Sequence, residues 1–257
     1  LMGAFAAFLK RRGITVTGSD QNVYPPMSDV LKGAGVALFS GYRPENLTTL
    51  PSRPDLVVIG NVIPRSNPEA QAAIEGGYAY TSLPEAMEKL MLASTRNLVV
   101  AGTHGKTTTS SLLAFTLAHA GRDPSYFIGG VSHDLPNSFQ VGSLDRGKFF
   151  VLEGDEYDTA FWDKVPKFNH YLPDDVILTS VEFDHADIYA DFAAVKRAFS
   201  GLMGRIRPGG RLIACADYAA VRELSTETSA KVITYGSEGS GARYFPRNIR
   251  VDADGVT

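Results

Sequence analysis

The sequence has 257 residues, of which 44% are hydrophobic and 21% are charged. This composition excludes a disordered chain and fits one large or two modest globular domains. The formal net charge of −3 gives no bulk attraction to nucleic acid or to an anionic membrane surface, and we expect neither as a partner. An anionic ligand therefore has to be held by local groups.

The chain contains one cysteine, Cys215, which excludes an internal disulfide and a cysteine-rich zinc site. Near the start, an apolar stretch comes before the basic residues, which is the reverse of a secretory signal. No apolar run approaches the roughly 18 residues that cross a bilayer. We therefore expect a soluble protein of the reducing cytoplasm, and the composition leaves its oligomeric state open.

Helical and strand patterns alternate in the first part of the chain. The expected elements are a helix over 3–12, strands over 14–17 and 36–39 with a helix capped by Ser28 between them, a strand over 55–60, a helix opened by Asn67 and Pro68, a strand near Tyr78 and a helix over 84–93. Strands separated by helices predict a parallel sheet. Because such domains normally begin with a strand and a glycine-rich turn, we expect that an opening strand is missing.

A second series of elements starts after residues 94–96. The expected elements are a strand from Asn97, a glycine-rich turn, a helix to about Ala120, strands near 126–130, 148–152 and 176–181, a helix over 191–203 and a strand over 210–216. After Ser237 the sequence predicts a loop and a β segment without a covering helix. The sequence thus predicts a Rossmann-like α/β domain over 1–94 and a P-loop-type α/β domain over 95–257, both with mainly parallel sheets.

The strongest chemical signal is VVAGTHGKTTTSSLL at 99–113, an apolar strand that runs through a glycine-rich turn into a helix. Backbone amides and a helix N-terminus converge there and form a cradle for phosphate, in which Lys106 can bridge terminal phosphates and Thr107 can ligate magnesium. The candidate ATP-binding residues are Gly102, Thr103, His104, Gly105, Lys106, Thr107 and Thr108. Val100 stands where the usual P-loop pattern has its first glycine, so an ordinary strand-to-helix turn is the alternative.

Two further strand ends carry acidic residues. FFVLEGDEYD at 149–158 has four carboxylates after an apolar strand, and Glu153, nearest the strand end, is the candidate metal ligand. VILTSVEFDHAD at 176–187 places His185 among carboxylates, where an imidazole can ligate a metal or carry a proton. The alternative for the first segment is a solvent-exposed acidic turn, and the alternative for the second is a histidine with a structural role only. Lys106, Glu153 and His185 are the candidate catalytic residues, and Thr107, Glu153 and His185 are the candidate metal ligands.

The first domain gives weaker signals for a nucleotide. An acid ends the strand TVTGSD at 15–20, where dinucleotide folds place the residue that binds a ribose hydroxyl, and a turn and a helix entrance further on could offer amides to a diphosphate. The candidate residues are Gly18, Ser19, Asp20, Asn61, Ser66 and Asn67. As alternatives, Ser19 and Asp20 cap a turn and Asn67 only caps its helix.

The order of AGTHGKTTT, FIGGV, EGDEYD and EFDHAD resembles the Mur ligase family, the cytoplasmic ATP-dependent amide-forming enzymes of peptidoglycan synthesis. The stretches GSDQNVYPPMS, GNVIPRSNPE and 156–189 resemble the branch that joins UDP-N-acetylmuramate to the recycled tripeptide L-alanyl-γ-D-glutamyl-meso-diaminopimelate. The sister branch, which adds L-alanine, usually has Ser where this chain has Tyr157, and it is the alternative. Family members often carry Asn at the position of Ser180, which leaves the role of this side chain open.

The resemblance implies a first domain that binds the UDP-substrate through the residues named above, and a central domain that uses ATP and Mg²⁺. It also implies that Lys106 and Thr107 contact the ATP phosphates and magnesium, and that Glu153 and His185 are metal ligands. The muramate carboxylate is then phosphorylated, and the peptide amine attacks the acyl phosphate. The family's closing C-terminal domain is not represented, so we expect these 257 residues alone to form little amide.

Three other classes of protein compete with this interpretation. A P-loop regulatory or transport ATPase would explain the phosphate cradle, but it leaves the acidic end at 182–187 and the first domain without a role. A nicotinamide-dependent oxidoreductase would need a glycine-rich fingerprint that the chain does not contain. A binding module without catalysis would keep the ligand sites alone.

Overall fold

The computed structural model describes residues 2–130, 133–142, 144–145, 147–183, 188–249, 251–252 and 255–256. In its second part, a seven-stranded sheet has the order β11-β10-β9-β5-β8-β6-β7. The strand pairs are parallel except for β6 with β7. The strands are β5 (Arg96–Ala101), β6 (Ser125–Phe127), β7 (Phe139–Gln140), β8 (Phe149–Glu153), β9 (Asp175–Leu178), β10 (Arg211–Cys215) and β11 (Lys231–Tyr235).

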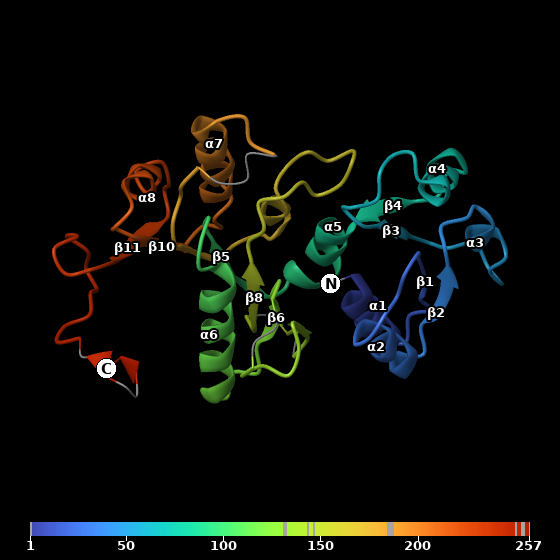
Figure 1. The fold of residues 1–257 in the computed structure, drawn as a ribbon, viewed down its shortest axis with the longest axis horizontal. Coiled ribbons are helices and arrows are strands. Elements are labelled where there is room, and N and C mark those ends of the chain that lie inside the picture. Colours follow the sequence, from blue (N-terminus) through green and yellow to red (C-terminus); the bar gives the residue numbers. More distant parts are fainter. Residues whose placement is uncertain are drawn as a thin grey trace.

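The helices of this part lie against the two faces of the sheet (Figure 1). They are α6 (Lys106–His119), the 3-10 turn η2 (Lys167–His170), α7 (Phe192–Met203) and α8 (Ala219–Leu224). Asp191 caps α7 by accepting a hydrogen bond from the Ala194 amide. A short antiparallel ribbon of β12 (Val251–Asp252) and β13 (Gly255–Val256) follows at the end.

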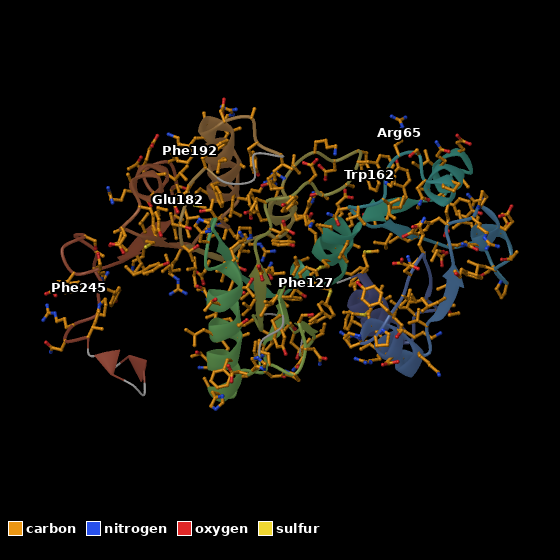
Figure 2. All side chains as sticks on the ribbon, viewed as in Figure 1. Arg65, Phe127, Trp162, Glu182, Phe192 and Phe245 are labelled. Carbon is orange, nitrogen blue, oxygen red and sulfur yellow. The ribbon has the colours of Figure 1, made fainter. Side chains whose placement is uncertain are left out.

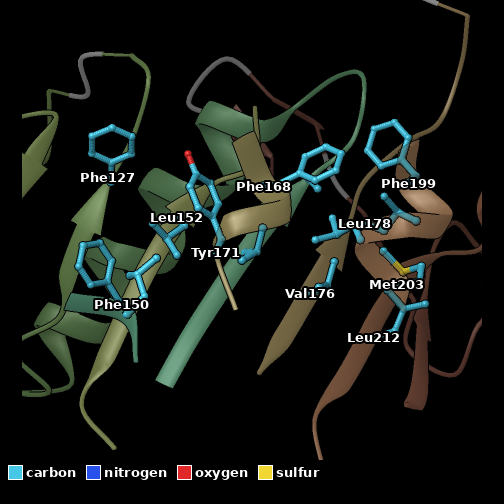
Figure 3. Packing of buried hydrophobic residues seen from close by; sticks show 14 of the residues in the cluster. Phe127, Phe150, Leu152, Phe168, Tyr171, Val176, Leu178, Phe199, Met203 and Leu212 are labelled. Atoms are coloured by element: carbon cyan, nitrogen blue, oxygen red, sulfur yellow. The ribbon is translucent and has the colours of Figure 1, made fainter. Parts of the chain in front are cut away.

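Alternating side chains of the strands build separate apolar clusters on the two faces of the sheet. In β8, Phe150 and Leu152 enter the larger cluster, which also contains residues of α7 and α8, whereas Val151 enters a smaller cluster against α6. Figure 3 shows the larger cluster, with Phe168 and Phe199 packed beside the strands at a ring separation of 5.6 Å. This burial on both faces explains why the strands are nearly continuous apolar runs.

The first part of the chain contains two parallel strand pairs, β1 with β2 and β3 with β4. Its elements are α1 (Met2–Arg11), β1 (Thr17–Asp20), α2 (Met27–Ala34), β2 (Ala37–Ser40), α3 (Glu45–Thr48), β3 (Val57–Ile59), α4 (Pro68–Glu75), β4 (Tyr80–Ser82), α5 (Leu83–Met87) and the π-helical turn η1 (Glu88–Leu92). Together with the larger sheet, these elements confirm the expected α/β class with mainly parallel strands.

Side-chain caps mark the starts of α4, α5 and α7, and one expected cap needs a correction. Ser82 and Glu85 form a complete capping box at the start of α5, and Pro84 lies in the first turn. The expected Ser28 cap is wrong: α2 begins at Met27, one residue earlier, and its N-cap is Pro26, which makes no side-chain cap. The first strand also begins later than expected, because pairing with β2 starts at Thr17.

The two parts of the chain share a core. Phe5 of α1 is buried in the larger cluster of the central sheet, and the ring of Phe8 lies 6.3 Å from that of Phe139 in β7. Of the helices that the structure describes, none has both the length and the apolar character needed to cross a membrane.

Candidate nucleotide-binding site

Parallel pairing brings the carboxyl ends of β5, β8 and β9 to one edge of the sheet. The turn after β5 leads directly into α6, whose first residue is Lys106 and whose N-cap, Gly105, is left-handed with φ of 78°. Gly102 lies so close to the next segment that a Cβ there would stand 2.2 Å from Thr179 Oγ1. Only glycine fits this position, and the glycine-rich turn thus lies tightly against the end of β9.

Ser180, buried at 2% exposure, fastens this turn. Its Oγ accepts a 2.9 Å hydrogen bond from the His104 amide and lies 3.0 Å from Thr103 Oγ1, while its carbonyl accepts from the Thr103 amide at 3.0 Å. Thr179 Oγ1 donates to His104 O at 2.6 Å. The role of Ser180 that the sequence left open is therefore to hold the turn.

This arrangement refines the expected cradle. The amides of Thr103 and His104 already donate to Ser180, so they do not point freely at a ligand. The first N–H groups of a helix have no partner within it, and for α6 these belong to Lys106, Thr107 and Thr108. The start of α6 therefore offers the amides and the positive helix end that an anion requires.

The ammonium of Lys106 folds back over the turn. Its Nζ donates to Gly102 O at 2.7 Å, to Thr103 O at 3.3 Å and to Glu156 Oε1 at 2.9 Å. The Lys106 side chain is 16% exposed and that of Glu156 only 2%. Lys106 thus lies over the turn and is paired with the carboxylate of Glu156. The sequence pattern did not distinguish Glu156 from the other acids of its segment.

Thr107 and Glu153 form a second pair beside the first. Thr107 Oγ1 donates to Glu153 Oε1 at 2.8 Å, and the Gly129 amide donates to Glu153 Oε2 at 2.7 Å. A Cβ on Gly130 would stand 2.6 Å from Thr107 Cγ2, so Gly130 packs closely against the start of α6. A hydroxyl and a carboxylate facing each other supply hard oxygen donors of the kind that Mg²⁺ prefers.

The other two acidic side chains of this segment form ion pairs with lysines. Lys167 Nζ donates to Asp155 at 2.6 Å, and Lys164 Nζ donates to Asp158 at 2.7 Å. Burial, together with the carboxylates of Glu156, Asp158 and Asp155, raises the pKa of Tyr189, whose hydroxyl donates to Glu156 O at 3.0 Å. The phenol therefore stays protonated beside the site.

The third expected cluster is only partly visible. Glu182 Oε2 lies 3.5 Å from His104 Nε2, with both side chains more than half exposed. His185, expected as a metal ligand, lies outside the described residues, as do Asp184 and Asp187. Among the residues that are described, no group of three histidine, cysteine or acidic side chains could hold a metal.

In the first part of the chain, Ser19 lies in a polar network at the ends of β1 and β2. Its Oγ donates to Glu69 Oε1 at 2.7 Å, while Asn46 Nδ2 donates to Glu69 Oε2 at 2.8 Å and the Arg43 amide to the same oxygen at 3.1 Å. Burial, followed by the charges of Asp20 and Glu69, raises the pKa of Tyr42. Both Asn46 and Glu69 were missed: Asn46 belongs to no recognisable motif, and Glu69 ends the stretch GNVIPRSNPE without a signal that separates it from its neighbours.

The other candidates of this part are more scattered. Asn67 caps α4, because its side chain accepts from the Glu69 and Ala70 amides, which is the alternative that the sequence had left open. Asp20 is exposed and accepts from the Asn22 amide at 3.1 Å. Asn61 and Ser66 are exposed as well, and Gly18 is half-buried within β1. As ligands of a UDP-substrate these residues stay predictions.

Contacts also join the loop after β8 to the first part of the chain. The Trp162 ring stands edge-on to Tyr80 at 5.1 Å, and Figure 2 shows Trp162 in the loop that extends toward β4. The ring of His170 lies between Glu88 Oε2, at 3.2 Å, and Asp163 Oδ2, at 2.8 Å. The acidic segment is thereby connected to η1 and β4.

Comparison with known proteins agrees with this geometry. Residues 100–257 match the Mur ligase middle domain, and residues 1–95 match the part described as Mur ligase family, catalytic domain. This chain belongs to the Mur ligase family. The structure of UDP-N-acetylmuramate:L-alanyl-γ-D-glutamyl-meso-diaminopimelate ligase from Neisseria meningitides is similar to it, with a TM-score of 0.86 and 34% identity over 100% of this chain and 80% of that one.

Two curated relatives carry the names of neighbouring branches of the family. The chain is 45% identical to the Escherichia coli UDP-N-acetylmuramate–L-alanyl-γ-D-glutamyl-meso-2,6-diaminoheptandioate ligase over 82% of its own length and 45% of the relative. It is 36% identical to the Chlorobium phaeobacteroides UDP-N-acetylmuramate–L-alanine ligase, over 97% of this chain and 50% of that protein. The chain thus spans about half the length of the curated relatives that it matches.

Proposed function

We propose that the chain carries the UDP-substrate and ATP sites of a ligase that joins UDP-N-acetylmuramate to L-alanyl-γ-D-glutamyl-meso-diaminopimelate. Residues 1–94 form the UDP-substrate domain and residues 95–257 the ATP domain. The observation that carries the proposal is the pairing of Lys106 and Thr107, at the start of α6, with acids at and just after the end of β8. Lys106 pairs with Glu156, and Thr107 pairs with Glu153. The higher identity to the tripeptide ligase than to the L-alanine ligase supports this choice of substrate.

The geometry at the start of α6 supports a phosphate site at this helix end. Its free amides and positive end attract phosphate oxygens, and Lys106 lies within reach to neutralise the charge that develops during phosphoryl transfer. Phosphoryl transfer of this kind needs positioning and charge neutralisation and no protein nucleophile. Ser180 contributes by keeping the turn rigid against β9.

The donor set beside the turn fits Mg²⁺. Thr107 Oγ1 and Glu153 Oε1 are 2.8 Å apart and provide the hard oxygen ligands, with His185 as a further proposed ligand. When bound, Mg²⁺ supplies charge stabilisation to the phosphate oxygens. Gly129 holds Glu153 in place through its amide, so the carboxylate is oriented before any ligand arrives.

The proposed reaction has two steps. A carboxylate oxygen of UDP-N-acetylmuramate attacks the γ-phosphorus of ATP, the bond to the β-phosphate oxygen breaks, and ADP leaves. The tripeptide amine then attacks the acyl carbon of the acyl phosphate, phosphate leaves with the electron pair of the C–O bond, and the amine loses a proton. In both steps Lys106 offsets negative charge on the phosphate groups.

Trapping the activated carboxylate tests this proposal. A full-length ligase that carries these 257 residues is incubated with Mg·ATP and UDP-N-acetylmuramate in the presence of hydroxylamine, and the muramoyl hydroxamate and ADP are measured. We expect both to form together, and we expect neither with the Lys106→Ala variant. ADP that forms at the same rate without UDP-N-acetylmuramate would instead indicate a P-loop regulatory or transport ATPase.

Replacing hydroxylamine by an amine substrate distinguishes the branches of the family. In a full-length ligase that carries these 257 residues together with a C-terminal domain, we expect the tripeptide to yield more amide than L-alanine at equal concentration, as measured by the mass of the product. A clear preference for L-alanine would assign the chain to the UDP-N-acetylmuramate:L-alanine ligases.

A further inference from the structure

Lys106 has no spare hydrogen for a ligand in this structure. Its three contacts, with Gly102 O, Thr103 O and Glu156 Oε1, equal the number of N–H bonds of an ammonium group. A nucleotide phosphate that binds Lys106 must therefore take the place of one of these acceptors. The three acceptors differ in charge, since only Glu156 is an anion.

Glu156 resembles a phosphate oxygen in its relation to Lys106. Its carboxylate approaches the ammonium at 2.9 Å, a usual length for a charge-assisted hydrogen bond. The pair is secluded, with only 2% of the Glu156 side chain and 16% of the Lys106 side chain exposed. Seclusion from water strengthens the attraction between the two charges and hence the competition with any other anion.

The surroundings keep Glu156 close to the turn. Its carbonyl accepts a hydrogen bond from Tyr189, and Gly154, at the start of the same segment, donates from its amide to Val100 O at 2.7 Å. Asp155 and Asp158 are held by Lys167 and Lys164, so these two acids do not compete for Lys106. Glu156 is the carboxylate of this segment that contacts Lys106.

We propose that Glu156 is a built-in competitor of the nucleotide phosphates for Lys106, and that it lowers the affinity for nucleotide that carries no metal. This inference rests on the proposed ATP site. The Glu156 carboxylate is bound to the Lys106 ammonium, the group that would bind a phosphate. A polyphosphate therefore has to displace this carboxylate from Lys106 and is repelled by its negative charge. A metal ion at Thr107 and Glu153 offsets that charge, which makes the site selective for the metal complex of the nucleotide.

The sign of one affinity change separates this role from a structural one. Glu156→Gln keeps the shape of the side chain and removes its charge, so we expect the affinity for ATP in excess EDTA to rise about tenfold, which corresponds to about 1.4 kcal/mol. The affinity for inorganic tripolyphosphate should rise by a similar factor, because the competition with Glu156 acts on the phosphate groups. A residue that merely supports the fold would leave the affinity unchanged or lower it.

Two further variants complete the titration experiment. Asp158→Asn removes one charge from the same segment, but its partner is Lys164 rather than Lys106, and we expect a change below about twofold. Combining Glu156→Gln with Lys106→Met should abolish the gain, because the competition needs the lysine. The inference alone is overturned if Lys106→Met weakens ATP binding but Glu156→Gln does not strengthen it. If neither the wild-type chain nor Glu156→Gln binds ATP or tripolyphosphate, the proposed function fails as well.

Thermal unfolding covers the case in which Glu156→Gln does not fold. Lys106→Met leaves the buried carboxylate of Glu156 without its cation, which is costly. The double variant Lys106→Met with Glu156→Gln removes both charges, and we expect it to unfold at a higher temperature than Lys106→Met alone. An equal or lower unfolding temperature would contradict the pairing on which the inference depends.

Discussion

The Thr107 hydroxyl and the Glu153 carboxylate are joined by a 2.8 Å hydrogen bond that links the first turn of α6 to the end of β8. Because the donors are a hydroxyl and a carboxylate, this pair is the part of the site best suited to a magnesium ion. The same pair is approached by the Gly129 and Gly130 backbone. A change at either residue should thus affect the metal dependence of nucleotide binding.

Thr107→Val should lower the affinity for Mg·ATP about tenfold, a loss of about 1.4 kcal/mol, while affecting metal-free ATP much less. The reason is that valine keeps the shape of threonine but lacks the oxygen ligand. Calorimetric titrations with and without Mg²⁺ measure the difference. Thr116→Val is the matched control, since its exposed hydroxyl donates to Leu112 O two turns further along α6. An equal loss with and without Mg²⁺ would argue against a metal ligand at Thr107.

Ser180→Ala should destabilise the protein by about 1–3 kcal/mol, because the part-buried His104 amide and the buried Thr103 hydroxyl lose their partner. We also expect weaker ATP binding, since the turn is no longer fixed on β9. Urea unfolding and titration with Mg·ATP measure the two effects. Ser225→Ala, which removes a hydrogen bond to a carbonyl of its own helix, should change ATP affinity little. Unchanged stability of Ser180→Ala would contradict the role given to this side chain.

Trp162 is the single tryptophan of the chain, so its fluorescence reports on its contact with Tyr80. Tyr80→Ala should shift the emission to longer wavelength, because the edge-on ring that shields the indole is removed. Tyr24→Ala serves as the control, as Tyr24 is 72% exposed. Identical emission from all three proteins would mean that the loop after β8 does not rest on β4 in solution.

The pKa of Asp175 leads to a prediction about how the stability of the protein depends on pH. Burial alone would raise its pKa, but hydrogen bonds and charges from Arg211 and Arg96 outweigh burial and lower it. A carboxyl with a lower pKa in the folded state stabilises the protein above its unfolded pKa of about 3.9, and this stabilisation is lost as the pH falls through the folded value. Asp175→Asn should therefore cost about 2 kcal/mol at pH 7 and progressively less below pH about 4.

Urea unfolding of the wild type and Asp175→Asn at a series of pH values tests this sign. The stability difference between the two proteins should shrink toward acid. A difference that stays constant from pH 7 to pH about 3 would show that the two arginines do not stabilise the ionised carboxylate.

The sequence was sufficient for the features that have strong local signals. Gly102, Gly105 and Lys106 mark the strand-turn-helix unit, and the apolar runs predict most strands of the central sheet, because both faces of these strands are buried. The strand β11 and the helix α8 were missed: half-exposed β11 lacks a continuous apolar run, and α8 has six residues. The Ser28 cap was misplaced because α2 already begins at Met27, after Pro26, an N-cap residue that makes no side-chain cap.

Side-chain pairs between residues far apart in the chain could not be predicted from the sequence pattern. Glu156 could not be separated from its acidic neighbours until the fold placed it 2.9 Å from Lys106, fifty positions away. Ser180 was noticed as a departure from the family, but its hydrogen bond to the His104 amide depends on the register of β5 and β9. In the first part, Asn46 and Glu69 meet Ser19 only through the packing of α3 and α4.

Calorimetric titration of the Lys106→Ala variant tests the central claim most directly. The claim predicts that Mg·ATP binds the wild-type chain and binds the variant at least about tenfold more weakly, since a charge-assisted contact to phosphate is lost. The affinity for UDP-N-acetylmuramate should stay within about twofold, because Lys106 belongs to the ATP domain. Equal binding of Mg·ATP by the two proteins, or parallel loss of both ligands, would contradict the account.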